Sequence, residues 1–179
     1  KIQGATVPVN QQIMDSGMIE KIALELMTPD QTKTFEATME MNLSFGVPRI
    51  GNFRINIFRQ RGSISIVIRY ILGNIPTMDS LGLPEVLSEL ILEKRGLILI
   101  VGSTGSGKST TIASMLDYRN ANRSGHILTI EDPIEFLFKH KKSIVNQREL
   151  GMDTLDWGSA LKNAMRQAPD CILIGEIRD

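Results

Sequence analysis

The sequence predicts an α/β protein in two parts, a smaller α+β domain followed by a larger α/β domain with a mostly parallel sheet. From residue 97 onward, apolar runs of strand length alternate with helical segments, which is the pattern of parallel sheets. Before residue 72, isoleucines alternate with polar residues on both sides of a turn, which indicates a hairpin. Residues 73–84 hold two glycines and two prolines with little periodicity. We therefore expect domains at 1–72 and 85–179, joined by a linker at 73–84.

The composition is that of an ordinary globular protein, with 42% hydrophobic and 22% charged residues. The formal net charge is zero, so no overall field favours nucleic acid, and no nucleic-acid partner is expected. Cys171 is the only cysteine, which excludes an internal disulfide framework and is typical of the reducing cytoplasm. No apolar stretch approaches the roughly 20 residues that a membrane helix needs.

The first domain is expected to hold one helix and one β-hairpin. The helix begins with a cap at Thr28, has a proline in its first turn, and runs to about Met41. The segment 53–72 alternates with a period of two, and Arg61-Gly62 supplies its turn. This period places five isoleucines on one buried face: Ile55, Ile57, Ile64, Ile66 and Ile68.

The second domain is expected to begin with a helix at 84–95, with Gly96 as its stop. From there on the pattern alternates between apolar strands and longer amphipathic helices. The expected strands are 97–102, 126–132, 143–149 and 171–175, and the expected helices are 108–120 and 155–168.

Residues 102–109 read GSTGSGKS and fit the pattern G-x-x-x-x-G-K-[ST] between a strand and a helix. The glycines let the backbone curl, so that several N–H groups point at phosphate oxygens. Lys108 would neutralise the β and γ phosphates beside the positive end of the helix, and the Ser109 hydroxyl would bind Mg²⁺. An ordinary Gly/Ser-rich turn is the weaker reading, because spacing and context both agree. The expected nucleotide-binding residues are Gly102, Ser103, Thr104, Gly105, Ser106, Gly107, Lys108, Ser109 and Thr110.

Two further segments bring acids to strand ends. Residues 171–176 read CILIGE, and in P-loop folds such a strand presents an acid towards the magnesium, here Glu176. The segment TIEDPIEF holds Glu131, Asp132 and Glu135 where a base that activates water would lie. Residue chemistry alone does not distinguish these three acids, and a solvated acidic loop is the alternative.

Four arginines lie on or near the expected hairpin: Arg54, Arg59, Arg61 and Arg69. They could simply form the polar face of the sheet. Alternatively, some of them reach a nucleotide's phosphates across a subunit boundary, as arginine fingers do.

The segments VGSTGSGKSTTIASMLDYRN, GHILTIEDPIEF, SIVNQRE and ALKNAMRQAPDCILIGEIRD together resemble the secretion-type hexameric ATPases. Within that group they are similar to the type IV pilus retraction ATPases of the PilT/PilU family. DYRN after the P-loop helix and LKNAMRQAPD before GEIRD favour the PilU branch. The resemblance extends from about residue 40 to residue 179 and is most specific over 97–179.

The resemblance implies a PAS-like first domain, a RecA-like ATPase domain and a ring of six subunits. It implies a cytoplasmic ATPase that uses ATP and Mg²⁺ to retract type IV pili for twitching motility, attached to the inner membrane only through the pilus machine. The implied partners are an inner-membrane platform protein and a partner retraction ATPase. Members of the family begin before KIQG and continue past GEIRD, so the sequence is expected to be part of a longer protein.

The resemblance also implies roles for single residues. Glu135 corresponds to the catalytic glutamate that polarises water, and Glu176 to the Walker B acid near Mg²⁺. The segments NFRIN and IVIRY match the strands that supply arginines from the first domain, which makes Arg54 and Arg69 the candidate arginine fingers. The chain departs from the family at Asn52, where retraction motors often carry another arginine.

Several alternatives to a retraction motor stay open. They are an accessory assembly subunit with weak hydrolysis that assists a partner motor, and a type II secretion or pilus extension ATPase. A small-molecule kinase or a DNA translocase is less favoured, because the chain has no lid-like insertion, few aromatics and no net charge.

Overall fold

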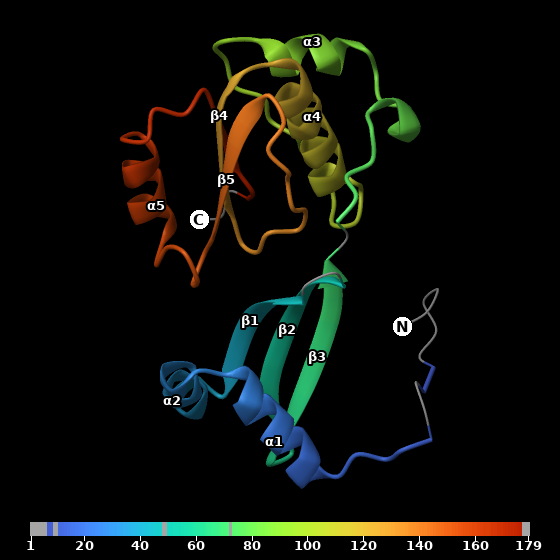
Figure 1. Ribbon diagram of the computed structural model, residues 1–179, viewed down its shortest axis with the longest axis vertical. Helices are drawn as coiled ribbons and strands as arrows, with labels where there is room; N and C mark the ends of the chain where they lie inside the picture. Colours follow the sequence, from blue (N-terminus) through green and yellow to red (C-terminus); the bar gives the residue numbers. More distant parts are fainter. Residues whose placement is uncertain (1–6, 9–10, 48–49, 72, 177–179) are drawn as a thin grey trace. The chain divides into compact units, whose positions relative to one another are not determined.

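The computed structural model describes residues 7–8, 11–47, 50–71 and 73–176. The chain divides into two compact units, Lys1–Tyr70 and Ile71–Asp179 (Figure 1). In the part of the chain that is described, no helix is both long enough and apolar enough to cross a membrane.

The first unit packs two helices against a three-stranded sheet of order β1-β2-β3. Strand β1 runs antiparallel to β2, with Glu40 opposite Phe58 and Val47 opposite Gly51. The elements are α1 (Ser16–Leu26), α2 (Pro29–Thr38), β1 (Glu40–Val47), β2 (Gly51–Gln60) and β3 (Ser63–Ile71).

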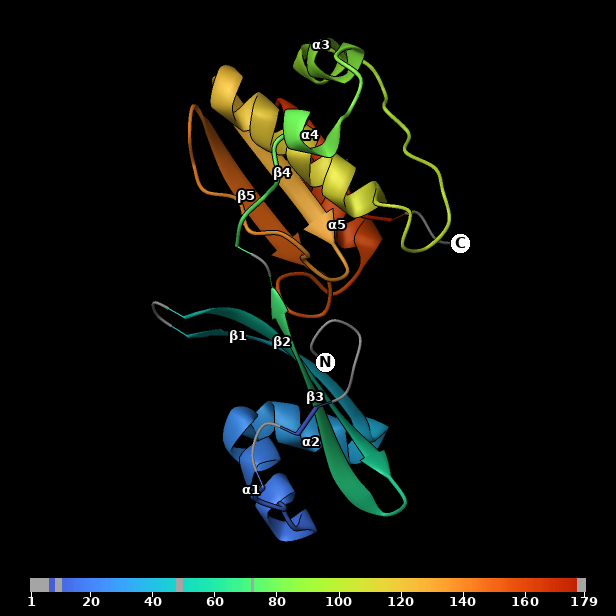
Figure 2. The ribbon, with the colours of Figure 1, turned by 90° about the vertical axis from the view of Figure 1, so that its right-hand side faces the viewer.

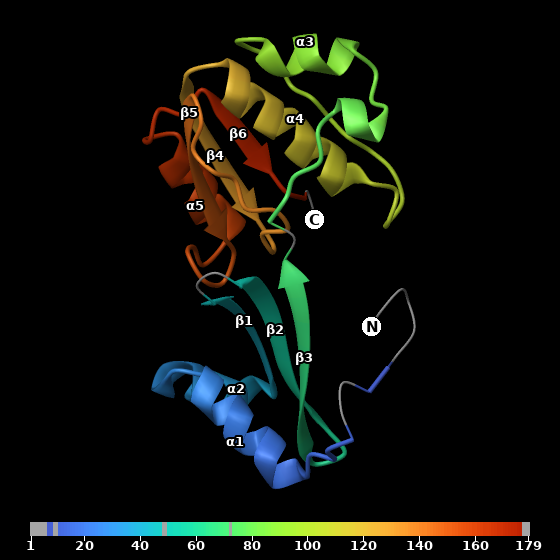
Figure 3. The ribbon, with the colours of Figure 1, turned by 45° about the vertical axis from the view of Figure 1, so that its right-hand side comes forward.

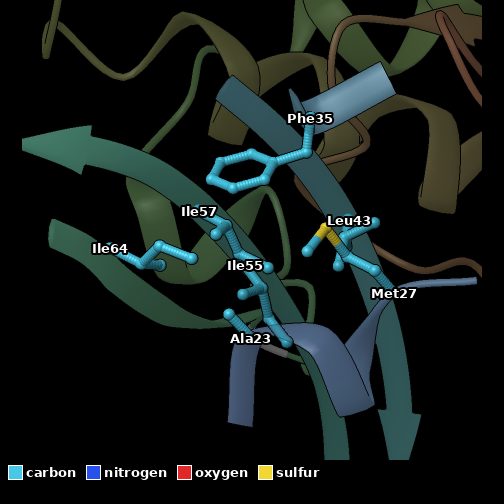
Figure 4. Close-up of a cluster of buried hydrophobic side chains, with 7 residues drawn as sticks. All are labelled: Ala23, Met27, Phe35, Leu43, Ile55, Ile57 and Ile64. Carbon is cyan, nitrogen blue, oxygen red and sulfur yellow. The ribbon is translucent and has the colours of Figure 1, made fainter. Parts of the chain in front are cut away.

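The core of this unit lies between the helices and one face of the sheet (Figure 4). Its largest side chain is Phe35 of α2, which is 1% exposed. Burial of such apolar side chains supplies the main stabilisation of the unit, roughly 1.5–3 kcal/mol for each large one. The buried members are Ala23, Met27, Phe35, Leu43, Ile55, Ile57 and Ile64.

The predicted helix after Thr28 is confirmed, including its cap. The Thr28 hydroxyl accepts from the Gln31 amide, and the Gln31 side chain accepts from the Thr28 amide, which forms a capping box. The helix ends at Thr38, earlier than expected, because Met39 adopts φ 64° and the chain then enters β1. Helix α1 and strand β1 were not predicted.

The predicted hairpin is also confirmed. Arg61 and Gly62 both have positive φ, 49° and 79°, as a tight two-residue turn requires. Ile68 was expected to be buried, but its side chain is 56% exposed. The reason is that the two helices cover only the end of the sheet where β3 begins (Figures 1 and 3).

The second unit contains a parallel sheet of order β5-β4-β6, in which β4 pairs with both neighbours (Figure 3). Helix α4 covers one face and α5 the other, while α3 packs on α4 (Figures 1 and 2). The elements are η1 (Asp79–Leu81), α3 (Val86–Leu92), α4 (Lys108–Asn122), β4 (Gly125–Glu131), β5 (Ser143–Glu149), α5 (Trp157–Ala164) and β6 (Cys171–Ile174).

Strand β4 is the centre of this unit and is buried on both sides. Ile127 packs with Met115 of α4, whereas Leu128 and Ile130 pack with Ala160 and its neighbours on α5. A strand with both faces covered is expected to be mostly apolar, as Ile127, Leu128 and Ile130 are. Its buried polar side chains, Thr129 and Glu131, hydrogen-bond to each other.

The prediction of a strand at 97–102 is wrong: the structure has no strand there. Residues 97–101 belong to neither sheet, and the side chains of Leu97 and Val101 are 81% and 91% exposed. An apolar run becomes a strand only when a neighbouring backbone pairs with it, and within the described residues no strand pairs with this one. Met78, within the expected linker 73–84, is buried in the core of the second unit.

Arg119 in α4 and Arg123, the residue directly after this helix, connect its end to α3. Arg119 is 3% exposed and donates to the carbonyl oxygens of Ile91 and Glu93. Arg123 donates to the carbonyl oxygen of Leu92. These carbonyls lie at the end of α3, where no further helical turn can pair with them, so the guanidinium groups satisfy them instead.

Candidate functional site

A cavity of about 500 Å³ in the second unit is bounded by three segments that the sequence singled out. They are the start of α4 with its preceding loop, the segment that follows β4, and the end of β6. The predicted site residues on its wall are Thr104, Gly105, Gly107, Lys108, Ser109, Thr110, Glu131, Asp132, Glu135 and Glu176. Gly102, Ser103 and Ser106 belong to the loop but do not line the cavity.

The loop before α4 has the curled backbone that its glycines predict. Gly105 and Gly107 have φ 79° and 92°, a region that side chains rarely adopt. At Gly102 a Cβ atom would lie 2.7 Å from the Ser106 hydroxyl, so a larger residue there would displace the Ser106 side chain. Helix α4 begins at Lys108, directly after this loop, so its unpaired amides and positive dipole end lie beside the cavity.

The Lys108 ammonium is held within its own loop. Its Nζ donates to the carbonyl oxygens of Gly102 at 2.9 Å and Ser103 at 2.8 Å. The positive charge therefore lies within the loop, beside the first turn of α4. A phosphate group is the ligand that such an arrangement of amides and ammonium suits best.

The three acids of TIEDPIEF, which the sequence left equivalent, have different environments. Glu131 is only 8% exposed, while Asp132 and Glu135 are exposed to solvent. The Glu131 Oε1 accepts from Thr129 Oγ1 at 2.7 Å and from Gln147 Nε2 at 3.2 Å. Burial raises the pKa of the Glu131 carboxyl above its ordinary value, although these two hydrogen bonds oppose the shift.

The ends of β4 and β6 approach each other closely. A Cβ atom at Gly175 would lie 3.2 Å from the Glu131 Cα, so a larger residue would push the strand ends apart. The Gly175 amide donates to the Ile130 carbonyl at 2.8 Å. This contact brings Glu176 to the same cavity wall as Glu131.

Sequence reasoning missed Gln147, which lies on β5 opposite Thr129 in the parallel register. Its Nε2 donates to Glu131 and to the Phe136 carbonyl, and its Oε1 accepts from the Phe138 amide at 2.9 Å. The available signal was the run of polar side chains NQRE at the end of a predicted strand, SIVNQRE.

The first unit has a second cavity, of about 360 Å³, on the open face of its sheet. Arg54 and Arg69 line it together with Asn42, Asn56 and Val67. The structure thus brings together two of the four arginines. Of the others, Arg59 lies over the Phe35 ring, with 5.7 Å from its Cζ to the ring centroid, and Arg61 forms the hairpin turn.

The fold and the loop before α4 define the class of the protein, an α/β protein of the P-loop type. A family model described as "Type II/IV secretion system protein" matches residues 15–179, and the chain belongs to this family.

Named relatives agree with the resemblance. The chain is 46% identical to the type IV pilus ATPase PilU of Pseudomonas aeruginosa, over 99% of the chain and 47% of that protein. It is 44% identical to PilT of the same organism, described as a type IV pilus retraction ATPase, over 100% of the chain and 52% of that protein. The chain thus spans about half the length of these relatives.

Solved structures agree as well. The pilus retraction motor PilT with bound ADP superposes with a TM-score of 0.86 at 52% identity, covering 89% of this chain and 47% of that one. The ATPase DotB of Legionella pneumophila superposes with a TM-score of 0.83 at 25% identity, covering 100% and 52%. The predicted resemblance to the PilT/PilU ATPases is confirmed, and the α/β fold is that of the secretion ATPases.

Proposed function

We propose that the chain is the nucleotide-binding part of an ATP-hydrolysing motor subunit that retracts type IV pili. The observation that carries this proposal is the single cavity on which Lys108, Glu135 and Glu176 all lie. The names of the relatives PilU and PilT support pilus retraction as the work performed. In this proposal the first unit is a PAS-like domain and the second a RecA-like ATPase domain.

The cavity has the groups that ATP and Mg²⁺ require. The amides of the loop and Lys108 would hold the phosphates, in the way that the curled backbone and the ammonium position suggest. Ser109 and Glu176 would hold Mg²⁺, because a hydroxyl and a carboxylate on one cavity wall are the hard oxygen ligands that this ion prefers. The ion, when bound, would screen negative charge on the phosphates.

Glu135 is the proposed base that orients the attacking water. Its side chain is exposed and lines the cavity, so it can meet both water and nucleotide. Glu131 is less suited, because it is buried and its Oε1 already accepts two hydrogen bonds. Asp132 also lines the cavity and is the competing candidate.

Arg54 and Arg69 are proposed to contact the nucleotide of a neighbouring subunit in a hexamer. Their shared cavity on an open sheet face is a positively charged surface that suits phosphate. The subunit would act in the cytoplasm at the inner membrane, through the pilus platform protein and a partner retraction ATPase, and without nucleic acid.

Replacement of Glu135 by alanine tests the proposal. We expect turnover of ATP by the intact protein to fall by at least about 100-fold, since a positioned base contributes about that much. Nucleotide affinity should persist, because the loop and Lys108 are unchanged. The measurement is steady-state phosphate release, together with sizing in the presence and absence of Mg-ATP.

Three outcomes separate the candidates. A hexamer whose turnover depends on Glu135 supports the motor. Binding without turnover in either protein contradicts the motor and favours an accessory assembly subunit. Retained turnover in the Glu135→Ala variant would contradict Glu135 as the base and favour Asp132 instead. Loss of turnover in an Asp132→Asn variant would then support Asp132.

A further inference from the structure

The Gln147 side chain joins the strands of the sheet to the segment that carries Glu135. Its Nε2 uses both hydrogens, one for Glu131 Oε1 at 3.2 Å and one for the Phe136 carbonyl at 2.8 Å. Its Oε1 accepts from the Phe138 amide at 2.9 Å. One side chain therefore holds the buried acid of β4 and two backbone groups just after Glu135.

A second anchor lies just before Glu135. The Ile134 amide donates to Glu149 Oε2 at 3.1 Å. Glu149 and Gln147 are two residues apart on β5, so their side chains leave the same face of the sheet. The backbone is therefore fixed on both sides of Glu135.

Glu131 also interacts with Glu135 itself. The Glu135 amide stabilises the charged form of the Glu131 carboxyl, while the negative charge of Glu135 opposes it. Thr129 and Gln147 donate to the same carboxyl group of Glu131 and fix its orientation. A change at Gln147 would leave this buried acid with one donor fewer, which loosens a group that interacts with Glu135.

From these contacts we infer that Gln147 is a positioning residue for ATP hydrolysis. It holds residues 134–138 in the conformation that directs Glu135 into the cavity, and does not itself touch the nucleotide. This inference rests on the proposed function, in which Glu135 orients the attacking water.

The test compares three substitutions in the intact protein. Gln147→Leu removes all three hydrogen bonds with little change in size. Gln147→Glu keeps the shape and an acceptor for the Phe138 amide, but cannot donate when ionised. The control is Asn146→Leu, which removes an amide from the same strand, where Asn146 hydrogen-bonds to His126 Nε2 at 2.9 Å, away from the cavity wall.

We expect kcat to fall by about 10–100-fold in both Gln147 variants, the usual effect of losing a group that orients a reacting one. KM for ATP and the affinity for ADP should change by less than about threefold, since the loop and Lys108 are untouched. Asn146→Leu should keep kcat within about twofold. Equal ADP-binding stoichiometry in every variant excludes a loss caused by unfolding.

A double substitution separates positioning from general support of the fold. Because Gln147 acts through Glu135, adding Gln147→Leu to Glu135→Ala should slow turnover no further. A further 10-fold loss would contradict the inference, as would a kcat unchanged in both Gln147 variants. Absence of turnover in the unsubstituted protein would instead overturn the proposed function, and with it the positioning role.

Hydrogen exchange supplies a readout that does not depend on turnover. The Phe138 amide should exchange at least about 10-fold faster in Gln147→Leu than in Asn146→Leu, because its acceptor is gone. An unchanged exchange rate would show that the anchor does not form, and would overturn the inference.

Discussion

At the scale of single residues, the two glutamates of TIEDPIEF show how the fold gives identical side chains different environments. Both line the cavity, but Glu135 is exposed, whereas Glu131 is buried and hydrogen-bonded to Thr129 and Gln147. Pairs of acids in contrasting environments commonly separate into a reacting group and a supporting group. The chemical distinction arises from burial, which a linear motif does not report.

The raised pKa of Glu131 predicts how stability depends on pH. Between the ordinary pKa of a glutamate and the raised one, the folded protein binds more protons than the unfolded chain. The free energy of unfolding of the second unit should therefore decrease as pH rises through that window. Glu131→Gln removes the titrating group, so its stability relative to the parent should increase over the same window. Denaturant unfolding at a series of pH values measures this.

Asp132→Asn is the matched control, because it removes an exposed carboxyl from the next position. Its stability should follow the parent profile. If the free energy of unfolding of Glu131→Gln changed with pH in parallel with that of the parent, the raised pKa of the Glu131 carboxyl would be contradicted.

At the scale of elements, those whose boundaries are set by neighbouring residues were predictable. Helix α2 follows from its capping box and proline, and the β2–β3 turn from Arg61-Gly62. Strand β1 and the segment 97–101 were not, because an extended run becomes a strand only where another strand pairs with it. Strand β2 pairs with β1, whereas no strand among the described residues pairs with 97–101. The prediction that Ile68 is buried was wrong for a similar reason. How much of the sheet the helices cover depends on where α1 and α2 end.

The same distinction applies to the site. The loop at 102–109 is contiguous and carries its own geometry, so spacing alone located it. Gln147 acts through partners 9 to 16 positions away, which meet it only after β4 and β5 pair in register. No local pattern encodes that meeting.

The cap of α2 gives a prediction at this scale. Thr28→Ala should lower the free energy of unfolding of the first unit by about 1 kcal/mol, because the Gln31 amide loses its acceptor. Thr34→Ala is the control, since Thr34 is exposed in the same helix and its hydroxyl donates to the Asp30 carbonyl and not to a capping partner. Chemical denaturation measures both. Equal losses in the two variants would contradict a specific capping role.

At the scale of the whole molecule, each unit has a hydrophobic core of its own. The predicted nucleotide cavity is lined entirely by residues of the second unit, and the arginine cavity entirely by residues of the first. Separate cores allow one unit to be perturbed without the other.

Ile57→Ala tests this separation. Ile57 is fully buried in the first core, and its truncation should cost about 2–5 kcal/mol there. The affinity of the second unit for ADP should stay within about twofold, because no residue of its cavity is changed. Thermal unfolding and a fluorescent ADP titration measure the two effects. A parallel loss of ADP affinity would mean that the second unit requires the first to keep its fold.

The two arginines at the end of α4, Arg119 and Arg123, have a mechanical consequence. The helix has 15 residues and so is a rod about 22 Å long. Lys108 lies in its first turn beside the cavity, and Arg119 and Arg123 connect its far end to the carbonyls at the end of α3. An axial shift of the first turn of α4 would therefore be transmitted along the helix to α3, because these hydrogen bonds join the two helices there.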